Sequence, residues 1–282
     1  NALPDEKVEA IEKFVEELSG DVSLGHLGLN AGKGISSHAF GKLSEVDSRS
    51  ALRFEMYGED TLETYLAALG PVVSADQLIN LDGKTIAIEG FGEHGPAMID
   101  LIEERGGKVI SISTLSGSIS EPSSFDTSDI RGRWGESGVD FVKSADGEVE
   151  PAWKVFQSGA DILFTGSKMG AVNHLTAEKL KVAALVPHQP IPFTARALAI
   201  LQRNNTIVVP DFIAVAAPIF ASWPGENTDV SQVIQSSIDH ISGVIDEVSN
   251  HDDGLFLGAC YRAESFLETW QEKRLFGRPL AS

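Results

Sequence analysis

A strand, a glycine-rich turn, a helix and a second strand follow one another in the first half of the chain, and this order constrains the fold most. Residues 84–89 (KTIAIE) are rich in β-branched side chains and lead directly into GFGEHG at residues 90–95. Residues 96–104 predict a helix that a glycine pair ends, and residues 108–113 (KVISIS) predict the next strand. Two strands joined in this way form a parallel βαβ unit.

The alternation of strands and helices continues toward the C-terminus. Strands are expected at residues 161–165, 182–186 and 206–209, and helices at residues 176–180, 194–203 and from Asp211 onward. Residues 116–150 are polar and are expected to form a surface connection, with at most a short strand at residues 139–142. The fold class is therefore α/β, a doubly wound and mainly parallel sheet of the Rossmann type.

Helices are expected to flank this sheet at both ends of the chain. Apolar residues at helical spacing predict them at residues 6–18 (ended by Gly20), 57–69 (ended by Gly70-Pro71), 230–248 and 254–272. We expect three regions: N-terminal helices with a Gly/Ser-rich lead-in (1–71), the sheet domain (72–226), and C-terminal helices packed on it (227–282).

Charge and hydropathy exclude several classes of partner. The chain has 41 acidic and 22 basic residues, a net charge of −19, which repels nucleic acid and anionic membranes. It has neither an apolar run of membrane-spanning length nor a start typical of a signal peptide. We expect a soluble, cytoplasmic protein.

Cysteine and histidine give no indication of a metal site. Cys260 is the only cysteine, so it has no partner for a disulfide or for a CxxC zinc motif. Four histidines, His26, His38, His94 and His188, lie scattered among expected loops without metal-ligand spacing, and we expect them to be surface or loop residues.

The chemistry centres on the GxGxxG pattern formed by Gly90, Gly92 and Gly95. The first glycine permits the tight turn, the second lets a pyrophosphate approach the backbone, and the third allows close packing of helix and strand. The helix N-terminus then favours the anion. These features predict a site for NAD or NADP; the alternative is a turn that needs glycine for its backbone geometry alone.

The remaining residues of the turn and the ends of the strands complete the expected site. Phe91, Glu93 and His94 fill the turn; Glu93 must face solvent to avoid repelling a pyrophosphate, and His94 is expected to face solvent too. Ser113 and Thr114 end the second strand where a carboxylate would read the ribose of NAD, so its absence favours NADP slightly, although no Lys or Arg follows Thr114. At the end of a later strand lie Thr165, Gly166, Ser167 and Lys168, the last able to contact a phosphate or a substrate carboxylate.

Three segments resemble the glutamate/leucine/phenylalanine/valine dehydrogenases. Residues 83–119, beginning GKTIAIEGFGEHG, are similar to the start of that family's cofactor domain; residues 160–166 (ADILFTG) and 206–212 (TIVVPDF) are similar to later strands of it. The resemblance covers about residues 82–223. It implies two domains with a cleft, NAD(P)-dependent oxidative deamination of an amino acid to a 2-oxo acid and ammonia, and an oligomer.

The chain also departs from the family's pattern. The lysine and aspartate motifs of the family's N-terminal substrate domain are absent, and only about seventy residues precede the sheet. Residues 188–197 (HQPIPFTARA) lack the asparagine that borders the nicotinamide in the family, and residues 215–222 (VAAPIFAS) keep only Ser222, which matches a serine near the substrate. No catalytic residue is therefore assigned.

Three functional hypotheses remain open. The first is a divergent NAD(P)-dependent oxidoreductase of the amino-acid dehydrogenase type, which binds an amino acid as a small-molecule substrate and needs a separate substrate domain. The second is a catalytically inactive NAD(P)-binding regulatory or sensor protein. The third, a structural homologue without a cofactor, is disfavoured by the intact glycines Gly90, Gly92 and Gly95.

Overall fold

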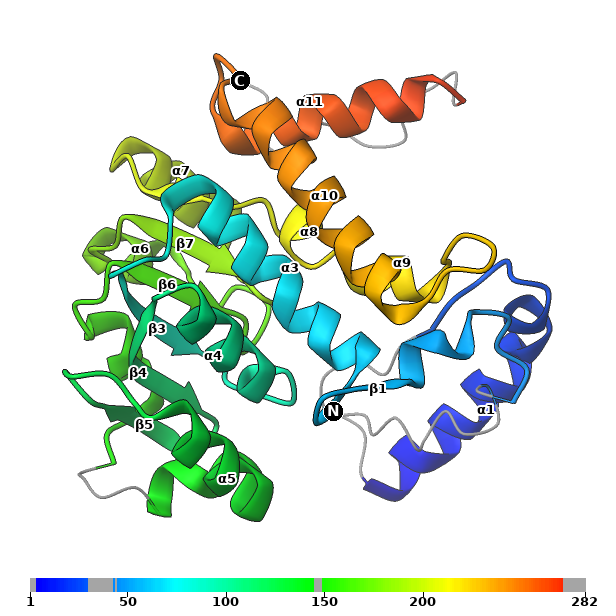
Figure 1. Cartoon of the computed structure of the whole chain (residues 1–282), viewed down its shortest axis with the longest axis horizontal. Helices are drawn as coiled ribbons and strands as arrows, with labels where there is room; N and C mark the ends of the chain where they lie inside the picture. The colour runs from blue at the N-terminus through cyan, green and yellow to red at the C-terminus, as the bar shows by residue number, and fades with distance from the viewer. Residues whose placement is uncertain (1–3, 30–42, 44, 145–148, 271–282) are drawn as a thin grey trace.

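A six-stranded sheet lies on one side of the molecule, at the left in Figure 1. The computed structural model describes residues 4–29, 43, 45–144 and 149–270. The strand order is β5-β4-β3-β6-β7-β8, and all pairs are parallel except β4 with β5. The strands are β3 (Thr85–Glu89), β4 (Lys108–Thr114), β5 (Gly117–Ser120), β6 (Ile162–Thr165), β7 (Ala184–Pro187) and β8 (Ile207–Val208). The predicted doubly wound, mainly parallel sheet is confirmed.

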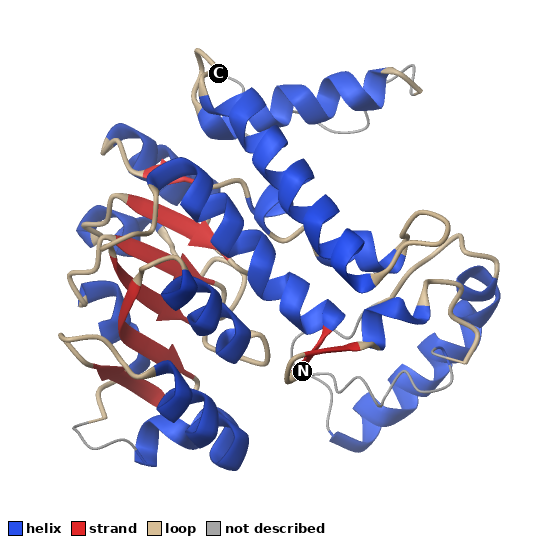
Figure 2. Ribbon diagram, viewed as in Figure 1, coloured by secondary structure: helices blue, strands red, loops and turns tan. Residues whose placement is uncertain are grey.

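Helices cover both faces of the sheet because its buried strands alternate apolar side chains between two cores (Figure 2). Ile88 of β3 belongs to one core and its neighbour Ala87 to the other. The first core is covered by α3 (Leu62–Ile79), α4 (Gly95–Glu104), α5 (Thr127–Ser137) and α10 (Val230–Ser249). The second is covered by the 3₁₀ helix η4 (Ala152–Gln157), α6 (His174–Lys179) and α7 (Ala195–Arg203).

Further elements lie at the two ends of the chain and after β8. At the N-terminal end they are α1 (Pro4–Ser23), the 3₁₀ helix η2 (Ala51–Phe54) and the antiparallel pair β1 (Met56–Tyr57) and β2 (Asp60–Thr61). After β8 come α8 (Asp211–Ala214), α9 (Pro218–Ser222) and, following α10, α11 (Leu255–Glu268). Helix α1 lies apart from the sheet, where Val15 and Val22 form a small cluster with Leu43 (Figure 1). The predicted flanking helices are thus present at both ends.

Two predicted helix ends are wrong, both for the same physical reason. Helix α1 continues past Gly20 to Ser23, because Val22 in its last turn is buried. Helix α3 starts after the β1–β2 pair and runs through Gly70-Pro71 to Ile79. An interior proline costs about 3 kcal/mol, whereas burial of one large apolar side chain contributes about 1.5–3 kcal/mol. Helix α3 buries several on both sides of the proline: Leu62, Leu66, Leu69, Val72 and Val73.

The polar stretch 116–150 is more structured than the sequence predicts. It contains the edge strand β5 and helix α5, whose first turn is capped by the carboxylate of Asp126. Residues 139–142, where at most a short strand was expected, form no strand and belong to a 3₁₀ helix, η3 (Gly138–Ser144). The helical turn buries the adjacent side chains of Phe141 and Val142 together, which the alternating faces of a strand would separate.

The order of the strands defines where a ligand can bind. From β3 the chain continues to β4 on one side, and later returns to β6, β7 and β8 on the other. The loops after β3 and β6 therefore leave the sheet in opposite directions. In open α/β sheets, ligands bind at this point, beyond the carboxyl ends of the strands.

Candidate functional site

The glycine turn after β3 has the geometry that its sequence predicts. Gly90 has a φ of +85°, and its N–H and that of Phe91 both donate to the carbonyl of Ser113, at 3.1 and 2.8 Å. A Cβ on Gly90 would lie 2.4 Å from the backbone nitrogen of Ser167. The turn thus packs against the loop after β6, and no side chain fits at residue 90.

The second glycine faces open space at the N-terminus of α4. A Cβ on Gly92 would have only one neighbour within 4 Å, the carbonyl oxygen of Gly90 at 3.8 Å. Within the described part of the chain, nothing accepts a hydrogen bond from the backbone N–H of Gly92 or Glu93. The side chain of Glu93 is exposed, which keeps its carboxylate directed to solvent. Two N–H groups and the positive end of a ten-residue helix can therefore receive an anion here.

The other turn residues have structural roles. A Cβ on Gly95 would lie 2.6 Å from the ring of Phe91, so the third glycine allows close packing. The ring of Phe91 itself packs against Trp134 and Phe141, with ring centroids 5.4 Å apart in each pair. Phe91 thus anchors the turn in the core, and neither its ring nor its N–H, which donates to Ser113, is available to a ligand.

The expected ribose-reading residues are buried at the end of β4. The hydroxyl of Thr114 donates to the carbonyl of Val139 at 2.7 Å and accepts from the N–H of Ser116 at 3.0 Å. The hydroxyl of Ser113 lies 3.4 Å from the N–H of Gly90, which donates to it. The Thr114 hydroxyl is therefore already engaged within the protein, and it holds the start of η3 against the sheet.

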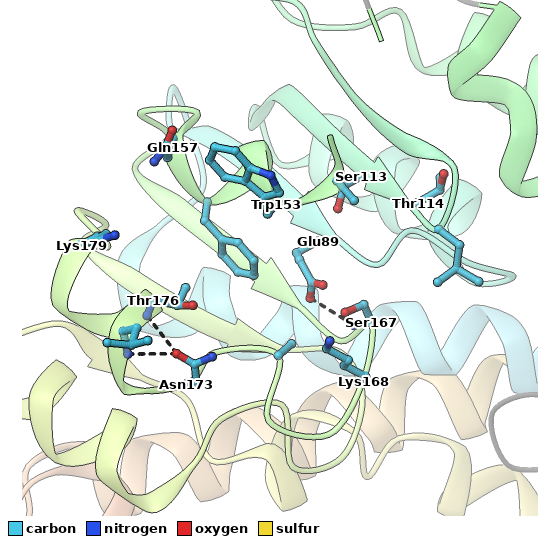
Figure 3. Close-up of a pocket in the computed structure, with 15 residues that line it drawn as sticks. Glu89, Ser113, Thr114, Trp153, Gln157, Ser167, Lys168, Asn173, Thr176 and Lys179 are labelled. Carbon is cyan, nitrogen blue, oxygen red and sulfur yellow. Dashed lines mark hydrogen bonds between the residues drawn. The ribbon is translucent and has the colours of Figure 1, made fainter. Parts of the chain in front are cut away.

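A cleft of about 560 Å³ lies along this edge of the sheet (Figure 3). It extends from the end of β4, past β3, to the loop after β6 and the N-terminus of α6. Lys168 is exposed at its border, and Asn173 caps α6 by accepting from the N–H groups of Leu175 and Thr176. Its lining includes Glu89, Ser113, Thr114, Trp153, Phe156 and Ser167.

Glu89, the last residue of β3, lies in the middle of this cleft (Figure 3). Its oxygen Oε2 accepts hydrogen bonds from the Thr165 hydroxyl at 2.8 Å and from the N–H groups of Gly166 and Ser167 at 3.0 and 3.1 Å. Thr165, Gly166 and Ser167 therefore hold a carboxylate of the protein itself. The backbone N–H groups of Gly166 and Ser167 therefore already donate to an acceptor within the protein.

His94 and His188 lie in loops, as expected, but the expectation that His94 faces solvent is wrong. Both are buried, and Nε2 of His94 lies 2.9 Å from Nδ1 of His188. Nε2 of His188 lies 2.8 Å from the carbonyl oxygen of Glu89, so it is this nitrogen that carries a proton and donates. His188 follows β7 directly, and the sheet brings it against the glycine turn. The two histidine rings lie between the glycine turn after β3 and the end of β7.

The remaining predicted positions lie away from the cleft. Ser222 is buried in α9, and its hydroxyl donates to the carbonyl of Pro218 in the same helix at 3.3 Å. His26 is exposed beside Asp21, and His38 is outside the described residues. Across the ranges that the structure describes, His, Cys, Asp and Glu form no group of three that could hold a metal ion. No described helix is both long and apolar enough to span a membrane.

Residues 65–224 match the family model of the glutamate/leucine/phenylalanine/valine dehydrogenases. The chain belongs to this family. Glutamate dehydrogenase of Thermotoga maritima is 32% identical over 53% of this chain and 36% of its own length. NADP-specific glutamate dehydrogenase of Saccharolobus shibatae is 24% identical over 68% of this chain and 46% of its own length. An NAD-specific relative from Staphylococcus aureus is 25% identical over 55% and 38%.

Solved structures share the fold beyond the matched segment. A hetero-hexameric glutamate dehydrogenase of Thermus thermophilus, in a leucine-bound form, aligns with a TM-score of 0.73 and 18% identity, covering 96% of this chain and 70% of that chain. Glutamate dehydrogenase of Plasmodium falciparum aligns with a TM-score of 0.67 and 16% identity, over 93% and 66%. The chain spans only 36–46% of the length of the curated relatives described above.

Sequence reasoning missed Glu89 and the histidine pair. Glu89 carried a usable signal, because it is an acidic residue at the carboxyl end of a buried strand, directly before the turn. His188 had the same kind of signal, as a polar residue directly after the buried strand β7. Both positions lie at the edge where parallel strands of such a sheet present ligand-binding residues.

Proposed function

We propose that this protein binds NAD(H) or NADP(H) along the carboxyl edge of its sheet and acts as a divergent oxidoreductase of the amino-acid dehydrogenase type. The observation that supports this most is the open N-terminus of α4, where Gly92 leaves space and two backbone N–H groups have no partner in the described chain. A pyrophosphate matches this arrangement in charge and in hydrogen bonding.

When bound, the oxidised cofactor would supply a hydride acceptor for the α-carbon of an amino acid. The amino group would lose a proton to solvent, and water would convert the resulting imine to a 2-oxo acid and ammonia. The residues of this chain would bind and orient the cofactor. The turn from Gly90 to Gly95 would hold the pyrophosphate, and the cleft would receive the adenosine half. Lys168, exposed at the cleft border, would supply a positive charge to a phosphate or to the substrate carboxylate.

The choice between the two cofactors is a finer part of the proposal. A carboxylate at the end of β4 would repel the 2′-phosphate of NADP, but Ser113 and Thr114 are there instead. Lys168 and Lys179 both line the cleft and add positive charge to it. These features favour NADP, and the curated relatives include both an NADP-specific and an NAD-specific enzyme.

Calorimetric titration with NAD, NADH, NADP and NADPH tests cofactor binding. We expect saturable binding to the wild-type chain and its loss in Gly92→Val, whose branched side chain would cover the two free N–H groups. Gly92 has open space around it, so this variant should fold normally. Gly132→Val is the matched control, because Gly132 is an exposed glycine in α5 with nothing within 4 Å of a Cβ. Absence of binding to the wild-type chain would refute the proposal.

A second candidate function is a regulatory or sensor protein that binds the cofactor without turnover. The His94–His188 pair supports this candidate. The His188 ring lies so close to Gly166 that a Cβ on that glycine would be 2.6 Å from it. His188 begins the segment 188–197, in which the family pattern has the asparagine that borders the nicotinamide. Tight cofactor binding without reduction of NAD or NADP, on a panel of all common amino acids, would favour this candidate over the first.

Oligomeric assembly and the source of the substrate-binding lysines belong to the same proposal. One structural relative is a hetero-hexamer. We propose that this chain also assembles with copies of itself or with a second polypeptide that completes the substrate site. Sedimentation of the purified chain, alone and with co-expressed family members, would measure this; a monomer in every mixture would refute it.

A further inference from the structure

The carboxylate of Glu89 is a fixed, buried charge at the floor of the cleft. The residue is 6% exposed, and three donors hold its Oε2. These donors come from three consecutive residues, the last of β6 and the two that follow it, so the side chain cannot rotate without breaking several hydrogen bonds at once. Such a position is well suited to present the second carboxylate oxygen in a defined direction.

The second oxygen, Oε1, has no hydrogen-bond partner among the described residues. In that part of the chain, every side-chain nitrogen or oxygen that is shielded from solvent does have a partner. Oε1 is therefore open to the cleft that Glu89 lines (Figure 3). A buried carboxylate that directs a free acceptor into a cleft is the arrangement of a recognition group.

The surroundings indicate which part of a dinucleotide would meet this oxygen. Glu89 directly precedes the glycine turn, and it is paired with Ser113 on β4 and with Thr165 on β6. Its side chain lies on the face of the sheet opposite to Ile88 and α4, where Trp153 and Phe156 add aromatic rings to the cleft. A pyrophosphate at the turn would leave this aromatic-lined space to the adenosine half.

A carboxylate oxygen can only accept hydrogen bonds, and it repels phosphate. We infer that Glu89 recognises a neutral hydrogen-bond donor on the adenosine half of the cofactor, either a ribose hydroxyl or the amino group of adenine. This inference rests on the proposed function and deepens it, because it assigns a specificity-determining role to a residue outside the GxGxxG pattern. Glu89 would position the adenosine, while the glycine turn binds the phosphates.

The variant Glu89→Gln tests this with little change in shape. The amide oxygen takes the place of Oε2 among the three donors, so the amide NH₂ faces the cleft and the acceptor there becomes a donor. Glu136→Gln is the matched control, because it removes the same charge at an exposed position of α5 that does not line the cleft. The dissociation constants of NAD, NADP and nicotinamide hypoxanthine dinucleotide would be measured by calorimetry for all three proteins, and thermal unfolding would check the fold.

We expect Glu89→Gln to bind the adenine cofactors at least tenfold more weakly than the wild type, and Glu136→Gln to bind them as the wild type does. If the wild type binds the hypoxanthine dinucleotide more weakly than NAD, the donor is the adenine amino group. If the wild type binds the two dinucleotides equally, the donor is a ribose hydroxyl. Unchanged binding by Glu89→Gln, or an equal loss in both variants, would overturn the inference alone. No binding by the wild type would overturn the proposed function and the inference together.

Discussion

At residue 90 the backbone turns with a φ of +85°, and the place of a Cβ is 2.4 Å from the nitrogen of Ser167. Gly90→Ala should therefore lower the free energy of unfolding for two reasons. The left-handed backbone costs about 1–3 kcal/mol, and the contact of the new Cβ with the loop after β6 adds to this. Gly83→Ala separates the two effects, because Gly83 has a φ of +72° and nothing within 4 Å of a Cβ. Urea denaturation of both variants is the measurement, and equal losses would show that the contact with Ser167 costs nothing.

Single residues also show where sequence reasoning reaches its limit. The roles of Gly90, Gly92 and Gly95 follow from local backbone geometry, and the structure has the turn that they predict. The pairing of His94 with His188 could not be predicted in this way. Ninety-four positions separate the two histidines, and only the placement of β7 two strands away from β3 brings them together. A contact of this kind depends on strand order, which no local pattern encodes.

The close packing of helix α3 against α8 can be tested at Gly70. At Gly70 this helix crosses the end of α8 so closely that a Cβ would lie 2.3 Å from the carbonyl oxygen of Ala214. We expect Gly70→Ala to lower the free energy of unfolding by about 1–3 kcal/mol, the usual cost of overpacking a core. Gly20→Ala in α1 is the control, since nothing lies within 4 Å of a Cβ there and alanine favours a helix by up to about 1 kcal/mol. The two variants should change thermal stability in opposite directions; a stabilising Gly70→Ala would refute the close crossing.

Secondary structure was predicted correctly where the sequence pattern matches the side of the element that is buried. Strands β3 and β4 are buried runs of β-branched residues on either side of helix α4, and their bounds agree with the sequence to within one residue. Helix α5 was missed because its sequence is polar and contains two glycines. It is held by Ile130 and Trp134, one turn apart, against the core. Its capping residue Asp126 was the available local signal.

At the scale of the whole molecule, a buried ionic cluster joins three distant parts of the chain. The carboxylate of Asp47 binds Arg49 at 2.7 Å and Arg53 at 2.8 Å, and all three side chains are at most 7% exposed. Arg49 also donates to the carbonyl of Leu29, and the N–H of Ser50 donates to the carbonyl of Ser222 in α9. The chain has a net charge of −19. In this cluster two of its arginine side chains help to attach the N-terminal segment to the rest of the fold.

Acid titration of this cluster is a test of that attachment. Burial alone would raise the pKa of Asp47, but hydrogen bonds from Arg49 and the charges of both arginines outweigh it and hold the pKa below its ordinary value. A lowered folded-state pKa stabilises the protein above the unfolded value of about 3.9, and this contribution is lost as the pH falls through the folded pKa. Asp47→Asn removes the carboxylate that pairs with both buried arginines, so it should cost about 3–5 kcal/mol at neutral pH.

The difference in unfolding free energy between wild type and Asp47→Asn isolates this one group, because the other carboxylates titrate in both proteins. It should be constant from pH 7 to about 5 and shrink progressively below about pH 4. Glu9→Gln, which removes an exposed ion pair with Lys13, should show little difference at any pH. A difference for Asp47→Asn that stays constant down to pH 2 would mean that hydrogen bonding to the arginines, not the charge of Asp47, attaches the N-terminal segment.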